Sequence, residues 1–170
     1  FGRVTLSSDN IYSDANSFLS RLGGRLSLNA MNIANSRFSF ETYLSYQHFL
    51  RSENAKNAPN NFIGIYQLAF SYATPKQFKV SLGRTINQKI PSLGAVDGVN
   101  IEKQFKSVFV GLISGFRPNY RNFLVDFGLY QTGVYTGINL NKTKFQLVST
   151  IGFIDQRNDW LTDRRFLATQ

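Results

Sequence analysis

The sequence predicts an all-β protein, an antiparallel up-and-down transmembrane β-barrel of about ten strands. Two observations carry this prediction. About ten stretches alternate apolar and polar residues, which is the period of a strand whose two faces meet different surroundings. The connections between these stretches alternate between short and long, and an up-and-down sheet places every second connection at the same end. Short turns at one end and longer loops at the other are typical of outer-membrane β-barrels.

The connections separate clearly by length. The short ones are expected at 34–36, 74–77, 106–107 and 141–142. The long ones, which are polar and irregular, are expected at 9–17, 51–61, 87–96, 117–126 and 155–162. All long loops would then face one side of a membrane, exposed at its surface, and all short turns would face the other side.

Composition fits this fold class. Aromatic residues make up 15% of the 170 residues, and charged residues make up 17%, below the roughly 25% of soluble domains. No apolar run approaches the roughly 20 residues of a transmembrane helix, which excludes a helical membrane protein. The absence of cysteine excludes disulfides and thiolate metal sites. The length suggests a single β-barrel domain over 1–170, or the N-terminal portion of one.

Five strands are expected in the N-terminal half, at 2–8, 19–33, 37–50, 62–73 and 78–86. Each has one apolar face, because residues two apart share a face in a strand. From the second strand onward these faces carry Leu22, Leu26, Leu28, Phe38, Phe40, Leu44, Tyr46, Phe62, Tyr66, Leu68, Phe70, Tyr72, Phe78, Val80 and Leu82. In a membrane barrel these faces contact lipid, and the opposite faces, rich in Ser, Gln and Gly with a few charges, line the lumen.

Five more strands are expected in the C-terminal half, at 97–105, 107–116, 127–140, 144–154 and 163–170. The first of these sets Val99 and Ile101 against Asn100 and Glu102. The fourth alternates equally well. The strands at 107–116 and 127–140 carry apolar residues or glycine on both faces, so the sequence does not decide which of their faces points inward.

Charged residues on the polar faces are expected to line the lumen and to set its selectivity. They are Arg21, Arg25, Arg37, Glu41, Lys79, Glu102 and Lys144. Cations outnumber anions in this set, and an excess of cations along a narrow passage favours anionic solutes. The alternative is that these side chains pair with one another and fill the interior.

A second set of basic residues lies on the long loops and on the strand ends next to them. We expect these residues to face lipopolysaccharide, whose phosphates pair well with Lys and Arg. The alternative is simple solvated loop charge. The set comprises Arg51, Lys56, Arg84, Lys89, Arg117, Arg121 and Arg157.

Enzyme chemistry finds little support. His48 is the only histidine, and one histidine without cysteine is a poor basis for a metal site. The glycine-containing segment 94–99 lacks the lysine and the following helix of a phosphate-binding loop. We therefore expect no catalytic residues, no metal and no cofactor. The net charge of +9 is spread along the chain rather than gathered in one stripe, which argues against nucleic acid as a partner.

Five segments carry a resemblance to a known family. They are SRFSFE at 36–41, LGR at 82–84 with Lys89-Ile90, GAVDGV at 94–99, GFRPNY at 115–120 and TDRRF at 162–166. Together they resemble porin-like outer-membrane β-barrel proteins of the Bacteroidota type. The resemblance implies the bacterial outer membrane as location and brings no catalytic residues. Members of that family are much longer, and the segments resemble their N-terminal part, which implies that this chain belongs to a larger barrel.

The leading expectation for function is a porin-like channel for small polar or anionic solutes, surrounded by outer-membrane lipid and lipopolysaccharide. One alternative is a non-conducting barrel that serves as a structural or accessory subunit beside other outer-membrane proteins. A second alternative is a soluble, lipocalin-like binding barrel. In that protein the apolar faces would point inward, and the outer faces would be rich in Lys and Glu rather than in Ser, Asn, Gln, Thr and Gly.

Overall fold

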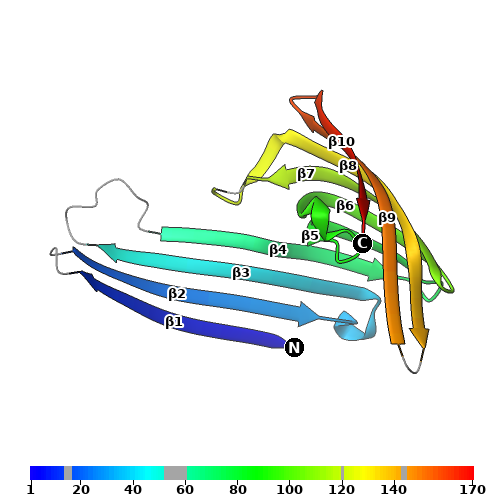
Figure 1. Ribbon diagram of the computed structural model, residues 1–170. Coiled ribbons are helices and arrows are strands. Elements are labelled where there is room, and N and C mark those ends of the chain that lie inside the picture. The colour runs from blue at the N-terminus through cyan, green and yellow to red at the C-terminus, as the bar shows by residue number, and fades with distance from the viewer. Residues whose placement is uncertain (14–16, 52–60, 120, 143–144) are drawn as a thin grey trace.

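The computed structural model describes residues 1–13, 17–51, 61–119, 121–142 and 145–170. They form one sheet of ten strands, each hydrogen-bonded to its neighbours in the sequence (Figure 1). All nine ladders are antiparallel, which confirms the all-β, up-and-down prediction. The strands are β1 Gly2–Ser13, β2 Ser17–Ala30, β3 Phe38–Arg51, β4 Asn61–Ala73, β5 Phe78–Ile86, β6 Ala95–Phe105, β7 Val108–Pro118, β8 Val125–Lys142, β9 Phe145–Asn158 and β10 Leu161–Thr169.

The sheet is curled but not closed. Strands β1 to β4 lie side by side as a gently curved layer, and β5 to β10 curl around the short helix η2, Pro91–Leu93 (Figure 1). In the described parts of the chain no ladder joins β1 to β10. Helices in those parts are single 3₁₀ turns, η2 and η1 at Ile33–Asn35, and neither has the length or hydropathy to cross a membrane.

The outer face of the sheet is apolar and exposed. A row of large side chains crosses it, because Phe40, Phe70, Leu82 and Val99 lie opposite one another in successive ladders. Phe70 is 58% exposed and Leu82 is 53% exposed. Phe38 lies two residues before Phe40 on β3, and Leu44 lies four residues after it, so the alternation assigns both to the same face. Contiguous exposed apolar faces mark sites of contact with protein, ligand or membrane.

The inner, concave face holds the buried core. Phe109 and Ile113 of β7 pack there with Tyr135 of β8 and with Ile90 and Leu93 of the connection before β6. Phe109 is completely buried. Burying side chains of this size stabilises the fold by about 1.5–3 kcal/mol each. This packing explains why the sequence of β7 is apolar on both faces, because one face meets the core and the other is exposed.

The connection at 87–94, expected as an exposed loop, is exposed only in part, at Gln88, Pro91 and Ser92. It folds back over the inner face, where Asn87, Ile90 and Leu93 are all buried. Its apolar side chains gain more by covering Phe109 and Ile113 than by remaining in solvent. We call residues 87–94 the inward connection.

The expected alternation in β4 is also wrong in its first half. Tyr43 lies opposite Gln67 and Leu44 lies opposite Ile65, which leaves Tyr66 as the extra residue of a β-bulge. A bulge reverses the faces of all residues beyond it. Ile63 therefore joins the exposed apolar face, where it is 59% exposed.

The side chains displaced by this bulge form a second inner cluster. The ring of Tyr66 lies 4.7 Å from that of Phe123, and the ring of Phe62 lies 5.5 Å from it. Phe123 belongs to the connection between β7 and β8. Because of the bulge, two aromatic rings on the inner face of β4 pack against that connection.

The alternation of connection lengths holds from β3 to β9. At the C-terminal end the expected long link at 155–162 is a two-residue turn, Asp159-Trp160. Both residues have positive φ, 47° and 66°, as a type I′ hairpin turn requires. At the other end β1 continues to Ser13, and the link expected at 34–36 extends over 31–37. Cross-strand pairing has extended β1, β9 and β10 into polar sequence that was expected to form loops, whereas β2 ends at Ala30, before the expected end at 33.

Candidate functional site

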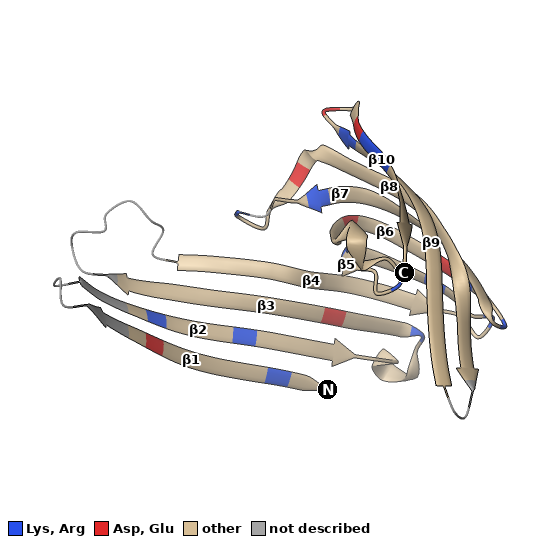
Figure 2. Ribbon diagram, viewed as in Figure 1, with Lys and Arg blue, Asp and Glu red and all other residues tan. Residues whose placement is uncertain are grey.

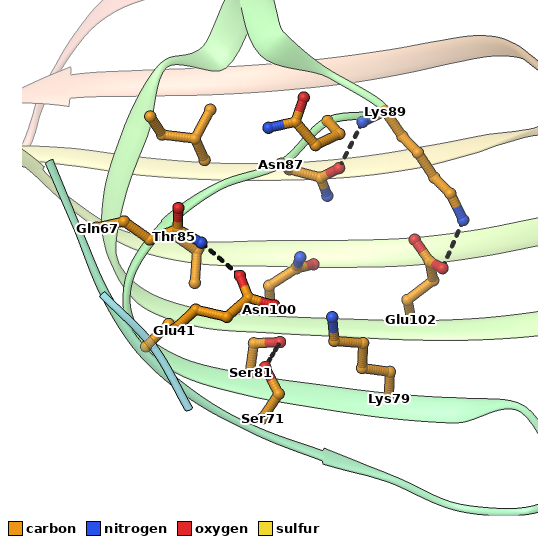
Figure 3. A pocket seen from close by; sticks show the side chains of 13 residues that line it. Glu41, Gln67, Ser71, Lys79, Ser81, Thr85, Asn87, Lys89, Asn100 and Glu102 are labelled. Carbon is orange, nitrogen blue, oxygen red and sulfur yellow. Dashed lines mark hydrogen bonds and ion pairs between the residues drawn. The ribbon is translucent and has the colours of Figure 1, made fainter. Parts of the chain in front are cut away.

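A polar cavity of about 320 Å³ lies on the inner face, between strands β3 to β6 and the inward connection (Figure 3). We call it the polar basin. Its polar lining consists of Glu41, Gln67, Ser71, Lys79, Ser81, Thr85, Asn87, Gln88, Lys89, Asn100 and Glu102. It is the candidate functional site because it collects charged and hydrogen-bonding side chains in one concave place.

Two rows of the ladder build the floor of the basin. In one row Ser71, Ser81 and Asn100 lie opposite one another on β4, β5 and β6. The two serine hydroxyls are 2.8 Å apart. In the next row Lys79 of β5 lies opposite Glu102 of β6. All five side chains share the inner face because they are separated by even numbers of residues along their strands.

The second row continues across the sheet through Gly111, Tyr135 and Gly152. The ring of Tyr135 covers Gly111, where a Cβ atom would stand only 2.1 Å from the ring carbon Cζ. On the other side, a Cβ at Gly152 would stand 2.4 Å from Cδ1 of Ile90. The two glycines therefore make room for the tyrosine and for the inward connection.

The hydroxyl of Tyr135 joins the connection to the strands. It accepts a hydrogen bond from Nδ2 of Asn87 at 2.8 Å. Its own proton can be donated either to Oδ1 of Asn100 or to Oε2 of Glu102, both 3.1 Å away. One buried phenol thus links three elements that are far apart in the sequence.

Lys89 provides the second attachment of the inward connection. Its ammonium donates to Oε1 of Glu102 at 2.5 Å and lies 3.9 Å from the centre of the Phe109 ring. The backbone N–H of Lys89 donates to Oδ1 of Asn87, which fixes the turn (Figure 3). Both charged side chains of the pair are 20% exposed, so solvent screens the attraction less than at an open surface.

Two other charges in the basin are not neutralised by an opposite charge. Glu41 accepts a hydrogen bond from the Gln67 amide at 2.5 Å, and no basic side chain among the described residues forms an ion pair with it. Lys79 makes no ion pair or side-chain hydrogen bond within the described parts of the chain, although it lies opposite Glu102. The basin therefore offers one carboxylate and one ammonium to a solute.

The structure brings together three of the seven residues expected to line the lumen: Glu41, Lys79 and Glu102. The others do not join them. Arg21 forms an exposed ion pair with Asp9 at 2.6 Å, and Arg25 of the same strand does not line the basin. Figure 2 shows the basic residues of β2 in blue. Arg37 is exposed just before β3. Lys144 lies outside the described residues.

Some of the basic residues expected at the rim are exposed, and others are not. Arg117, at the end of β7, and Arg121, in the next connection, are exposed. Arg157 binds Asp155 at 2.8 Å. Lys56 lies outside the described residues, and the side chain of Arg51 does too.

Lys89 and Arg84 do not lie on an exposed rim. Lys89 turns into the basin, as described above. Arg84 is 6% exposed and binds both carboxylate oxygens of Asp97 at 2.6 Å. Its Nη1 donates to the carbonyls of Ile65 and Phe123 at 2.7 Å each. The ion pair with Asp97 forms because the ladder places Asp97 directly opposite Arg84. The two bonds from Nη1 join the β7–β8 connection to β4.

Sequence reasoning missed Tyr135, Asn87, Asn100 and the pair Ser71–Ser81. The glycines at positions 111 and 152 were a usable signal for Tyr135, since glycine in a strand often marks a close approach of another group. Nothing in the sequence alone pointed to Asn87. Its role depends on the inward fold of its connection.

The basin presents hydrogen-bonding and charged side chains to a bound molecule. In the described parts of the chain no group of three or more His, Asp or Glu side chains could hold a metal ion. The basin contains hydroxyls, amides, carboxylates and ammonium groups, but its lining includes no histidine. Comparison with known proteins gave no match to a family model, to a curated protein or to a solved structure.

Proposed function

We propose that the protein is a wall segment of a porin-like β-barrel of the bacterial outer membrane, which passes small polar or anionic solutes. Outer-membrane lipid and lipopolysaccharide are its proposed surroundings, and the family it resembles is the Bacteroidota-type porin-like group. Since β1 and β10 are not paired with each other, the proposal includes further strands that complete the barrel. It includes no catalytic step.

The observation that supports this proposal best is the inversion of the two faces. Large apolar side chains such as Phe70 and Leu82 are exposed on the outer face, and the concave face carries hydroxyl, amide and charged groups in the basin beside its apolar core. Membrane barrels have this arrangement because lipid surrounds them and water fills them. A soluble lipocalin-like barrel would place its apolar face inside.

A second candidate is a non-conducting barrel that acts as an accessory subunit of an outer-membrane complex. The inward connection favours it, because Ile90 and Leu93 occupy space on the concave face and Lys89 and Asn87 hold them there. A connection in this position narrows a lumen. Whether it also closes the lumen depends on how wide the completed barrel is.

Conduction separates the two candidates. We expect the full-length protein in a planar bilayer to pass ions, with a preference for anions. Arg25→Glu should shift the reversal potential towards cations, because it changes a charge on the inner face of β2. The matched control is Lys76→Glu, the same change at the exposed turn before β5. A silent bilayer that contains correctly inserted protein would favour the accessory subunit.

Contact with lipid tests the orientation directly. Trp160 is first replaced by Phe, and a single new tryptophan is placed at Phe70 or at Tyr43. Brominated acyl chains should quench the fluorescence of Phe70→Trp on the outer face and spare Tyr43→Trp on the inner face. Equal quenching at both positions would contradict a membrane-spanning wall with these two faces.

A further inference from the structure

We infer that the polar basin binds short zwitterionic chain molecules of the class of di- and tripeptides. The carboxylate of the ligand meets the ammonium of Lys79, and its ammonium meets the carboxylate of Glu41. The inference deepens the proposed channel function and rests on it, because the basin would lie on the wall of the lumen.

The charges of the basin carry the first step. Of its four charged side chains, Lys89 and Glu102 neutralise each other across 2.5 Å. Glu41 is bonded only to the neutral amide of Gln67, and Lys79 has no partner in the described residues. One negative and one positive group remain. A ligand with one charge of each sign pairs with both, whereas a simple anion is attracted by Lys79 and repelled by Glu41.

The spacing of the two charges selects the length of the ligand. Glu41 shares a ladder row with Ala69 and Gly83, and Lys79 lies four residues from Gly83 on β5. A rise of roughly 3.4 Å per residue and a strand spacing of roughly 4.8 Å place the two Cα atoms about 17 Å apart.

The side chains shorten this distance. Those of Glu41 and Lys79 reach towards each other from opposite sides of the Ser71–Ser81 pair (Figure 3). The two charged ends therefore lie closer together than the Cα atoms. A chain of two or three residues, at roughly 3.4 Å each, spans less than the Cα separation and reaches further than a single amino acid, whose two charges are attached to one carbon.

The middle of the basin suits peptide groups. Ser71 and Ser81 place two hydroxyls between the charges, and each hydroxyl can donate or accept a hydrogen bond. Asn100 uses its oxygen for Tyr135, which leaves its amide N–H groups available to a peptide carbonyl. The volume of about 320 Å³ is at the lower end of the range of small-molecule sites, which excludes long peptides.

The test is a calorimetric titration of the full-length protein in detergent with triglycine as the probe. We expect saturable binding. Lys79→Gln and Glu41→Gln should each weaken it by about ten- to a hundredfold, the range for a hydrogen bond to a charged group. The exposed Lys76→Gln is the matched control and should bind like the wild type. The charge exchange Glu41→Lys with Lys79→Glu should bind triglycine again, in the opposite direction.

Three further outcomes decide the inference. N-acetyl-triglycine, which keeps the carboxylate and lacks the ammonium, should bind at least tenfold more weakly than triglycine. If it binds equally well, the basin is an anion site and the inference is overturned. No binding of triglycine by a protein that conducts ions would overturn the inference alone, whereas binding by a protein that is silent in a bilayer would uphold it and overturn the channel.

Discussion

The ammonium of Lys89 lies 2.5 Å from Oε1 of Glu102, although the residue directly opposite Glu102 in the ladder is another lysine, Lys79. The carboxylate therefore bonds to the connection that precedes its strand rather than to the neighbouring strand. The pairing of Glu102 with Lys89 has two consequences. The connection is held on the inner face, and the ammonium of Lys79 is left for other partners.

Loss of the Lys89–Glu102 pair should loosen the inward connection without unfolding the sheet. In Lys89→Gln we expect amide hydrogen exchange at Ile90 and Leu93 to become about tenfold faster, which corresponds to roughly 1.4 kcal/mol. Lys106→Gln, at the exposed β6–β7 turn, is the control. Exchange that is unchanged in Lys89→Gln would mean that apolar packing alone holds the connection.

Gly111→Ala should destabilise the protein by about 1–3 kcal/mol, the usual cost of overpacking. The new Cβ would stand 2.1 Å from the Tyr135 ring, so the ring must move away from its hydrogen-bonding partners. The free energy of unfolding from urea titration measures the effect. Gly24→Ala is the control, since its Cβ would meet Leu6 at an ordinary 3.7 Å. Equal stability of the two variants would contradict the position of the Tyr135 ring.

Arg84→Leu should be more damaging than any exposed charge change. It leaves the carboxylate of Asp97 enclosed without its partner, and breaking a buried pair in this way costs about 3–5 kcal/mol. Arg21→Leu removes a pair whose arginine is 46% exposed, for which about 0–1 kcal/mol is expected. The comparison of the two unfolding free energies is the measurement, and similar losses would show that Arg84 is not enclosed.

Phe70→Arg tests the outer face energetically. In a bilayer an arginine at mid-strand costs about 2–4 kcal/mol, because hydrocarbon cannot solvate its charge. Gln146→Arg, on the inner face of β9, should leave the unfolding free energy in lipid vesicles nearly unchanged. Equal unfolding free energies of Phe70→Arg and Gln146→Arg in vesicles would contradict the membrane proposal.

Periodicity predicted the strands and the shared face of Glu41, Lys79 and Glu102, because both depend only on residues two apart. It could not predict the bulge at Tyr66, since a bulge depends on how β3 and β4 fit together. From that point towards the start of β4, every expected face is reversed. The register of a ladder is long-range information that one strand does not contain.

Charge read from the sequence alone misplaced Lys89 and Arg84. Both were assigned to an exposed rim because they stand in or beside polar links. Their actual positions follow from partners thirteen residues further along the chain, Glu102 and Asp97, which only the β5–β6 ladder brings into reach. The inward fold of the connection was hidden for the same reason, since Ile90 and Leu93 are covered by β7, β8 and β9.

The meander connectivity sets an order of assembly for the inner wall. Every ladder joins consecutive strands, so each strand can be added to an edge that already exists, with little loop-closure entropy at each step. Lys89 meets Glu102 when β6 is added, and it meets Phe109 when β7 follows. Asn87 finds Tyr135 only with β8. Assembly that proceeds from β5 towards β8 would therefore add the attachments of the connection one at a time.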